Sequence, residues 1–215
     1  GGATWTRKYI NDPTVPGYGN SLPLGGHKNG MYFRDTSRGW IGGDTPADGF
    51  VYFYTTVDGG ITWAQQPLTL PAGYANAYVT LSAPVFFGAT EARLPVWLGT
   101  NAGRDLFIYT SHDGGASWAV SSGFAHGAEG ADFVSTTTAF SWDWGNLFHV
   151  TTNAGATWQT VTPNVNFSDS FRGLDFVSPT TGWVILGYPD NSTALYRTID
   201  GGATWTLLSS NAAPT

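Results

Sequence analysis

Short runs of alternating apolar and polar residues, separated by turns rich in glycine, asparagine and aspartate, extend along the whole chain. Such runs occupy 50–54, 106–109, 147–150 and 194–196, and they are typical of β-strands. The 29 Gly and 12 Pro residues are too many for long helices and suit short strands joined by tight turns. The pattern therefore predicts an all-β chain.

An eight-residue turn motif recurs at intervals of roughly 50 residues. A complete copy has a Ser or Thr, then Asp-Gly-Gly, then a second Ser or Thr followed by Trp, and residues 1–6 repeat 201–206 letter for letter. The third copy is weaker, because Asn and Ala replace Asp and the first Gly. In the four copies, the Asp (or Asn) and Trp positions of the motif are Asp58 and Trp63, Asp113 and Trp118, Asn153 and Trp158, and Asp200 and Trp205. This period is typical of the blades of a β-propeller.

A second motif, an aromatic-ended strand, a polar turn and a Trp-led strand, precedes each turn motif, at 33–42 and 176–184 and more loosely at 86–97 and 133–142. One repeat unit is therefore predicted to be a four-stranded antiparallel blade. The expected organisation of 1–215 is a single β-propeller domain or a fragment of one, with blades at about 28–70, 80–123, 129–163 and 171–209, and with 1–10 as the outer strand of a preceding blade. We expect a longer chain or a second chain to complete the ring; a closed four-bladed ring is the alternative.

The turn motif has a physical basis. A carboxylate placed before two glycines can accept hydrogen bonds from the backbone N–H groups of its own turn, and glycine adopts the positive φ angles that such a turn requires. The Trp is expected to wedge between neighbouring blades. Because Ala154 replaces a Gly, the third turn is expected to be the most strained or altered of the four.

The octet S/T-x-D-x-G-x-S/T-W resembles the Asp-box, or BNR, repeat of sialidases and of many other secreted β-propellers. Together with the upstream Phe and Gly-Trp element, it is similar to the BNR-type propellers related to the photosystem II assembly factor family. The resemblance implies a ring of roughly six to eight blades, a secreted or cell-envelope location in a bacterium, and a ligand face opposite the Asp turns. It also implies that the Asp, Asn and Trp positions of the turns are structural.

Composition and charge narrow the function classes. Charged residues make up 11% of the chain and aromatic residues 15%, which excludes a disordered chain and a coiled coil. The net charge is −6 and the nine Lys and Arg residues are scattered, so a nucleic acid partner is not expected. There is no apolar run long enough to span a membrane, and the absence of Cys excludes disulfides and thiolate chemistry. No cofactor and no metal site are predicted, since the four His residues lie in separate segments.

The candidate ligand residues lie in the inner strands and loops on the face opposite the Asp turns. Aligning the inner strands places Asn29, Ser82, Glu129 and Arg172 in one tier and Tyr32, Val85, Asp132 and Asp175 in the next. Glu129, Asp132, Arg172 and Asp175 are the charged residues expected to meet around a central pocket; the alternative is that they are solvated loop residues and backbone-bonding Asp side chains. Exposed aromatics are a further binding signal, with Trp144 beside Trp142 and Asp143 as the candidate.

These observations favour a non-catalytic extracellular or envelope-associated propeller that binds a protein or a glycan. The alternative is a glycoside hydrolase of the sialidase-like propeller group, which would use two carboxyl groups of the central pocket. Phe33 and Arg34 are followed by Asp35 and Thr36 rather than by the Ile-Pro that sialidases carry, so no sialidase catalytic residue is assigned.

Overall fold

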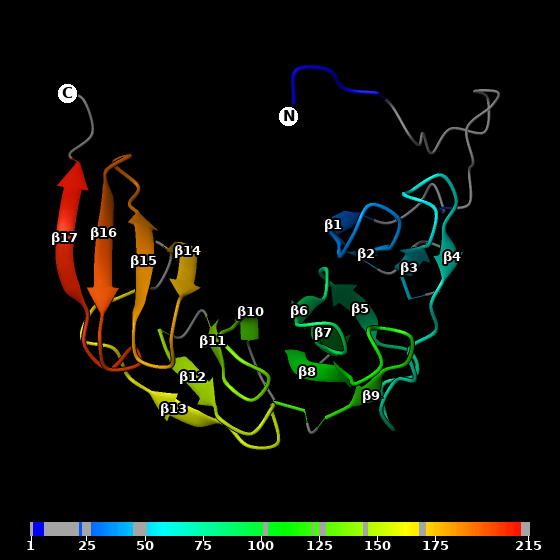
Figure 1. Cartoon of the computed structure of the whole chain (residues 1–215). Helices are drawn as coiled ribbons and strands as arrows, with labels where there is room; N and C mark the ends of the chain where they lie inside the picture. Colours follow the sequence, from blue (N-terminus) through cyan, green and yellow to red (C-terminus); the bar gives the residue numbers. More distant parts are fainter. Residues whose placement is uncertain are drawn as a thin grey trace. The chain divides into compact units, whose positions relative to one another are not determined.

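The chain folds into antiparallel β-sheets. The computed structural model describes residues 2–6, 22, 27–44, 51–100, 103–121, 123–124, 128–143, 146–167 and 171–211, and these ranges contain strands but no helix (Figure 1). The described ranges therefore contain no helix that is long and apolar enough to cross a membrane. The strands form four sheets, each of which has the meander order of a propeller blade. The predicted fold class, an all-β propeller of four-stranded blades, is confirmed.

Contacts within the chain divide it into two compact units, and the boundary passes through one strand of the second sheet. Unit 1 comprises Gly1–Asn101 and Tyr109–Val120, and unit 2 comprises Ala102–Ile108 and Ser121–Thr215. Sheet 1 has the order β1 (Lys28–Phe33), β2 (Gly39–Gly43), β3 (Phe53–Thr56) and β4 (Ala64–Gln65). Sheet 2 has the order β5 (Tyr78–Leu81), β7 (Glu91–Thr100), β8 (Gly103–Ser111) and β9 (Ala119–Val120), with β6 (Val85–Phe87) paired to β7.

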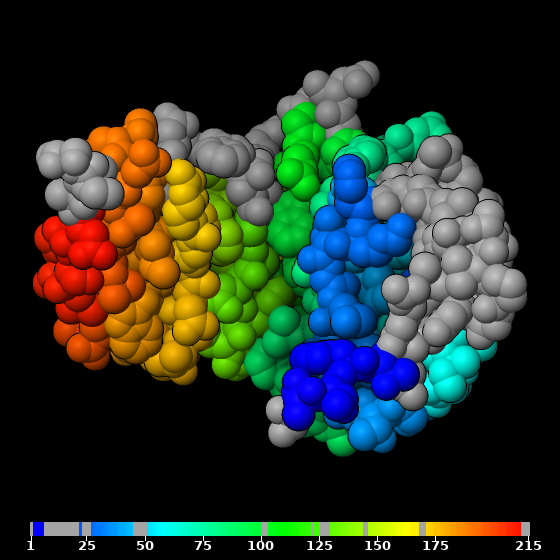
Figure 2. Space-filling view, turned by 90° about the horizontal axis from the view of Figure 1, so that it is seen from above, coloured from blue at the N-terminus to red at the C-terminus, as the bar shows by residue number. Residues whose placement is uncertain are grey.

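Sheets 3 and 4 belong to unit 2 and are regular meanders. Sheet 3 has the order β10 (Ala128–Phe133), β11 (Ala139–Asp143), β12 (Phe148–Thr151) and β13 (Gln159–Val161). Sheet 4 has the order β14 (Phe171–Phe176), β15 (Gly182–Gly187), β16 (Thr193–Thr198) and β17 (Thr206–Asn211). In Figure 2 the strands of sheet 4 run from gold to red, and β17 forms an exposed edge.

The inner strands carry an irregularity near the same position. The register shifts by one residue in β1, β10 and β14, at Asn29, Glu129 and Arg172. In sheet 2 the inner strand is broken into β5 and β6, which pair with successive parts of β7. Pro84 lies in the break and Pro95 lies in the part of β7 opposite it, and proline supplies no N–H for a sheet ladder. The first tier of candidate residues therefore sits at bulges or breaks.

The turn motif, here called the Asp turn (56–63, 111–118, 151–158 and 198–205), folds in nearly the same way in all four sheets. In the first, Asp58 Oδ1 accepts the backbone N–H groups of Ile61 and Thr62 at 3.0 and 2.9 Å, and Oδ2 accepts the Thr62 hydroxyl at 2.6 Å. Gly59 and Gly60 have φ angles of 74° and 88°. Each side chain thus satisfies N–H groups that the tight turn leaves without a strand partner.

Each Asp turn is also fixed to the turn that joins the first two strands of its own sheet. Gly59 N donates to Ser37 O at 2.8 Å, and the same bond is made by Gly114 to Thr90, Ala154 to Thr137 and Gly201 to Thr180. Both turns therefore lie at one end of each sheet. The loop between the second and third strands lies at the opposite end, because neighbouring strands are antiparallel.

Acid is expected to destabilise the fold through these turns. Hydrogen bonds from the Thr62 hydroxyl and backbone lower the pKa of Asp58 from 3.8 to about 2, and equivalent bonds from Ser117 and Thr204 lower the pKa values of Asp113 and Asp200. Because these folded-state values lie below the unfolded ones, the stabilisation is complete above pH 3.8 and is lost as the pH falls towards 2. Urea unfolding at pH 5 and pH 3 should show this loss.

A reciprocal pair of variants tests the origin of that pH dependence. Asp58→Asn should flatten the fall in unfolding free energy between pH 5 and pH 3, and Asn153→Asp should steepen it. An identical pH slope for the parent protein and both variants would mean that the Asp turns do not cause the acid sensitivity.

The third Asp turn keeps this geometry at a cost in backbone strain. Asn153 Oδ1 accepts Thr157 N at 2.9 Å, so the amide replaces the carboxylate. Ala154 has φ 57°, in the left-handed region where Gly59, Gly114 and Gly201 each have φ 74°. A Cβ in this region clashes with the following carbonyl. The expectation that this turn is the most strained is confirmed at Ala154.

Ala154→Gly is therefore expected to raise the free energy of unfolding by about 0.5–1 kcal/mol, since relief of the strain exceeds the added entropy of the unfolded chain. Equilibrium urea unfolding measures the change. Ala156→Gly is the matched control, because Ala156 lies in the same turn without a positive φ, and it should give no gain. An equal effect of both substitutions would argue against strain at Ala154.

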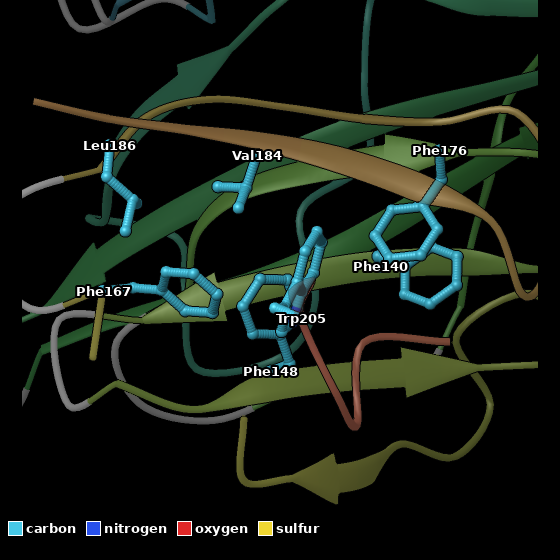
Figure 3. Packing of buried hydrophobic residues seen from close by; sticks show 7 residues of the cluster. All are labelled: Phe140, Phe148, Phe167, Phe176, Val184, Leu186 and Trp205. Carbon is cyan, nitrogen blue, oxygen red and sulfur yellow. The ribbon is translucent and has the colours of Figure 1, made fainter. Parts of the chain in front are cut away.

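Aromatic residues from two sheets form the core of unit 2. The cluster contains Phe140, Phe148, Phe167, Phe176, Val184, Leu186 and Trp205 (Figure 3). Phe140 of sheet 3 and Phe176 of sheet 4 are stacked with ring centroids 3.5 Å apart. Trp205 packs edge-on against Phe167 and Phe176. The Trp of the fourth Asp turn thus packs between sheets 3 and 4, as expected.

The other Trp residues vary in their packing. Trp118 of sheet 2 packs edge-on against Phe53 of sheet 1, and Trp158 lies against Phe124. Trp63 contacts Phe33 of its own sheet and a cluster that includes Ile41. Residues 2–6 form no strand and Trp5 is 90% exposed. The assignment of 1–10 to a preceding blade stays a prediction.

Candidate functional site

A cavity of about 210 Å³ opens in unit 2, at the end of sheets 3 and 4 opposite the Asp turns. It lies where the β11–β12 loop meets the segment leading into β14. Its lining is Trp142, Asp143, Asn146, Leu147, Phe148, Phe167 and Phe171. We call this cavity the aromatic pocket. It lies on the face that the sequence predicts to bind a ligand.

Two aromatic pairs form the walls of the aromatic pocket. Trp142 of β11 stacks on Phe171 of β14, with ring centroids 4.4 Å apart and planes at 25°. Phe148 meets Phe167 edge-on at 5.0 Å. Trp142 also lies directly over Gly130 of β10, where a Cβ would collide with the indole. Glycine at this position therefore allows the indole to lie flat against the inner strand.

The polar groups of the pocket hold its loop in shape. Asp143 Oδ1 accepts Leu147 N at 3.1 Å, and Oδ2 bonds to Nε2 of the buried His149 at 3.1 Å. His149 Nδ1 is 3.2 Å from the Thr160 hydroxyl. Asn146, at φ 65°, accepts Phe167 N through its side-chain oxygen. The Asp143 carboxylate and the Asn146 side-chain oxygen are thus already engaged, and the other five lining residues are aromatic or aliphatic.

Asp132 connects the inner strands of sheets 3 and 4. Its Oδ2 accepts the backbone N–H of Phe176 at 2.6 Å. Burial raises the pKa of Asp132, and the nearby charge of Asp175 adds to the effect. This bond shows a backbone-bonding role for Asp132, which was one of the two alternatives from the sequence.

No described contact brings Glu129, Arg172 or Asp175 together with the Asp132 carboxylate around a common pocket. Arg172 is exposed, donates to Phe171 O at 3.1 Å and lies over Gly187. Asp175 is exposed on the side of sheet 4 that faces away from sheet 3. Glu129 is placed by its backbone in β10, and its side chain and the whole of Trp144 lie outside the described residues. Ligand binding by Glu129, Asp132, Trp144, Arg172 and Asp175 stays a prediction.

A polar cluster in unit 1 lies at the end of sheet 1 that is opposite its Asp turn. Asp44 accepts Asn29 Nδ2 at 2.6 Å and bonds to His27 Nδ1 at 2.9 Å. These bonds, with others from Tyr78 and Thr80, lower the pKa of Asp44 against the effect of burial. Within the described ranges, no three His, Asp or Glu side chains come together as metal ligands. The Asp44 carboxylate is satisfied by these partners, and His27 and Asn29 are exposed, so the aromatic pocket is the stronger candidate site.

Sequence reasoning identified part of the aromatic pocket. Asp143 was placed in a loop of the predicted ligand face, but the aromatic candidate there was Trp144, and Trp142 was named only as its neighbour. Phe167, Phe171 and Asn146 were missed. The available signal was the position of two Phe residues just before and at the start of an inner strand, where their rings can reach the neighbouring sheet.

Comparisons with known proteins give structural neighbours only. No protein-family model matches the chain, and no curated protein matches it. A structure of YCF48 bound to D1 peptide is 17% identical, with TM-score 0.45, over 87% of this chain and 82% of that chain. YCF48 from Cyanidioschyzon merolae is 12% identical, with TM-score 0.38, over 87% of this chain and 86% of that one. The GH74 xyloglucanase from Xanthomonas campestris is 14% identical, with TM-score 0.44, over 85% of this chain and 38% of that one. These likenesses identify no activity for this chain.

Proposed function

We propose that this chain is a non-catalytic propeller module that binds a protein partner, and that the aromatic pocket receives one large apolar or aromatic side chain of that partner. The observation that carries the proposal is the lining of the pocket. Four of its seven residues are aromatic, Asp143 accepts Leu147 N of its own loop, and the side-chain oxygen of Asn146 accepts Phe167 N. Binding in such a pocket is driven by burial of apolar surface, and few groups remain for new hydrogen bonds with a ligand.

The size of the pocket supports the same assignment. At about 210 Å³ it is smaller than the roughly 300–1,000 Å³ of sites that enclose a whole drug-sized ligand. It suits a single anchoring side chain, which is how interfaces concentrate their binding energy. A sugar ring could stack on Trp142, but its hydroxyl groups would find only Asp143 and Asn146 as carboxylate or amide partners in this lining.

The glycoside hydrolase alternative has weaker support. It needs two carboxyl groups free to act on a glycosidic bond. One carboxylate oxygen of Asp132 already accepts the Phe176 backbone N–H, and Asp175 lies on the other side of sheet 4 from the aromatic pocket. A non-catalytic role is therefore the better-supported proposal for these residues.

Because the turn motif resembles the Asp-box, we propose that the Asp turns are Asp-box repeats. For the same reason we propose that the protein works outside the cytoplasm, in the cell envelope or as a secreted protein. Fractionation of the source cells tests the location. Recovery in the cytoplasm would contradict it.

Display selection tests the binding proposal. A random peptide library and a glycan array are each probed with the parent protein, with Trp142→Ala and with Trp5→Ala, which removes an exposed Trp that is not part of the pocket lining. We expect enriched peptides that share a large apolar or aromatic residue and that bind the parent and Trp5→Ala but not Trp142→Ala.

Two other outcomes would overturn the proposal in different ways. Glycan binding that requires Trp142, without peptide binding, would identify a lectin-like module. Turnover of chromogenic glycosides that is abolished by Asp175→Ala would identify a hydrolase.

A further inference from the structure

The aromatic pocket contains two polar side chains among five aromatic or aliphatic ones. Asp143 ends β11 and Asn146 follows it in the β11–β12 loop, and both line the cavity. In a mainly apolar pocket, the apolar lining supplies most of the binding free energy, and a few fixed polar groups decide which ligand is accepted. The hydrogen bonds that Asp143 and Asn146 offer therefore restrict the side chain that this pocket can receive.

Both polar side chains are held by groups on the buried side of the pocket. Asp143 Oδ2 lies 3.1 Å from Nε2 of His149, whose side chain is 5% exposed. Asn146 Oδ1 accepts the backbone N–H of Phe167, a residue that is also 5% exposed. The backbone of Asn146 has φ 65°, a left-handed conformation that Asn adopts more readily than most residues. The carboxylate and the amide are thus fixed before a ligand arrives, which lowers the entropy cost of binding.

Asp143 offers a hydrogen-bond acceptor. Its side chain is 13% exposed, so water reaches it at few points. A carboxylate can accept about four hydrogen bonds, and the bonds from Leu147 N and His149 Nε2 each use a different oxygen of Asp143. A ligand that covers this carboxylate without donating a hydrogen bond removes its water and does not replace the lost hydrogen bonds. The bound side chain should therefore carry an O–H or N–H group at this point.

Asn146 offers the opposite kind of group. A backbone N–H can only donate, so the atom that faces Phe167 N is the amide oxygen, and Nδ2 is the remaining polar atom of the side chain. In the part of the chain that the structure describes, no hydrogen bond of Asn146 Nδ2 is found. An amide N–H group donates and cannot accept. The bound side chain should therefore also supply an acceptor.

We infer that the aromatic pocket receives a tyrosine side chain, an inference that rests on the binding role proposed above. The phenol O–H donates to the Asp143 carboxylate, and the phenol oxygen accepts an N–H from Asn146 Nδ2. The ring packs on the aromatic lining, of which Trp142 and Phe148 are members. Phe and Leu side chains offer neither hydrogen bond, Trp can only donate, and Ser, Thr and His carry less apolar surface. Among the standard side chains, only Tyr joins a large aromatic ring to a group that both donates and accepts.

Display selection separates tyrosine from other large residues. Peptides that bind the parent protein but not Trp142→Ala should share a Tyr. If they share Phe, Leu or Met instead, this inference is wrong, and the proposed binding function stands. If no enriched peptide depends on Trp142, the proposed function itself is wrong, and the tyrosine assignment falls with it.

A double-mutant cycle tests whether the phenol meets Asp143 and Asn146. A selected peptide and its analogue with Phe in place of Tyr are titrated calorimetrically into the parent protein, Asp143→Asn and Asn146→Gly. With the parent protein, the change from Tyr to Phe should weaken binding at least tenfold, because one of the lost hydrogen bonds is to a charged group. With each variant, the factor by which the same change weakens binding should be at least threefold smaller.

The controls separate this contact from a general change of the pocket. The affinity for the Phe analogue reports any change of shape that a substitution causes. Asn146→Gly permits the same loop conformation, since glycine adopts a positive φ without strain. Asn191→Gly is the matched control, because Asn191 has φ 62° in the β15–β16 loop and does not line the pocket. It should give the same Tyr-to-Phe factor as the parent protein. Less than threefold weakening with the parent protein, or one common factor for all variants, would overturn the inference.

Discussion

Trp205→Ala is expected to lower the free energy of unfolding by about 3–5 kcal/mol, the usual loss when a buried large aromatic residue is truncated. Trp205 is 3% exposed and packs against Phe148, Phe167 and Phe176 (Figure 3). Its indole N–H donates to Gly202 O at 2.9 Å, so the substitution also leaves a buried carbonyl without that donor. The loss should therefore fall near the upper end of this range.

The chain contains a matched control for this substitution. Trp5 occupies the same Gly-Ala-Thr-Trp-Thr sequence as Trp205 but is 90% exposed. Trp5→Ala should change the unfolding free energy by less than about 0.5 kcal/mol. Urea unfolding followed by circular dichroism measures both. Equal losses would show that Trp5 is packed as Trp205 is, and a negligible loss for Trp205→Ala would contradict its role between sheets 3 and 4.

Trp142→Ala is expected to weaken binding of a selected peptide about 30-fold or more, which corresponds to about 2 kcal/mol for an aromatic anchor site. The substitution removes one wall of the aromatic pocket and the stacking partner of Phe171. Isothermal titration calorimetry measures the dissociation constant.

Trp142→Phe is the conservative control for that prediction, because it keeps an aromatic face over Gly130. It should retain most of the affinity. If Trp142→Ala binds as tightly as the parent protein, the peptide does not enter the aromatic pocket.

The repeat made the sheets predictable from the sequence. The Asp turns, the four strands of each blade and the strain at Ala154 follow from local chemistry, since each depends on residues close together in the chain. The two copies of Gly-Ala-Thr-Trp-Thr mark the limit of that reasoning. Residues 1–6 and 201–206 are identical, yet Trp205 is buried between sheets 3 and 4 and Trp5 is exposed, so the local sequence alone does not fix the burial of the Trp.

The candidate site was less predictable because it depends on contacts between sheets. The role of Asp132 as acceptor for Phe176 needs the inner strands of sheets 3 and 4 to lie side by side. The aromatic pocket needs the β11–β12 loop to turn at Asn146 with a positive φ, which brings its side chain to Phe167. Periodicity placed Trp142 on a strand but did not show that Phe171 would stack on it.

Fluorine NMR measures whether a partner's side chain enters the aromatic pocket. The protein is labelled with 5-fluorotryptophan, the Trp142 resonance is assigned as the one missing in Trp142→Phe, and the Trp205 resonance as the one missing in Trp205→Phe. A peptide from the display selection is then titrated in. We expect a shift of the Trp142 resonance that saturates with the calorimetric dissociation constant, while the Trp205 resonance stays in place. Saturable shifts of other tryptophan resonances with Trp142 unchanged would show that the partner's side chain binds outside the aromatic pocket.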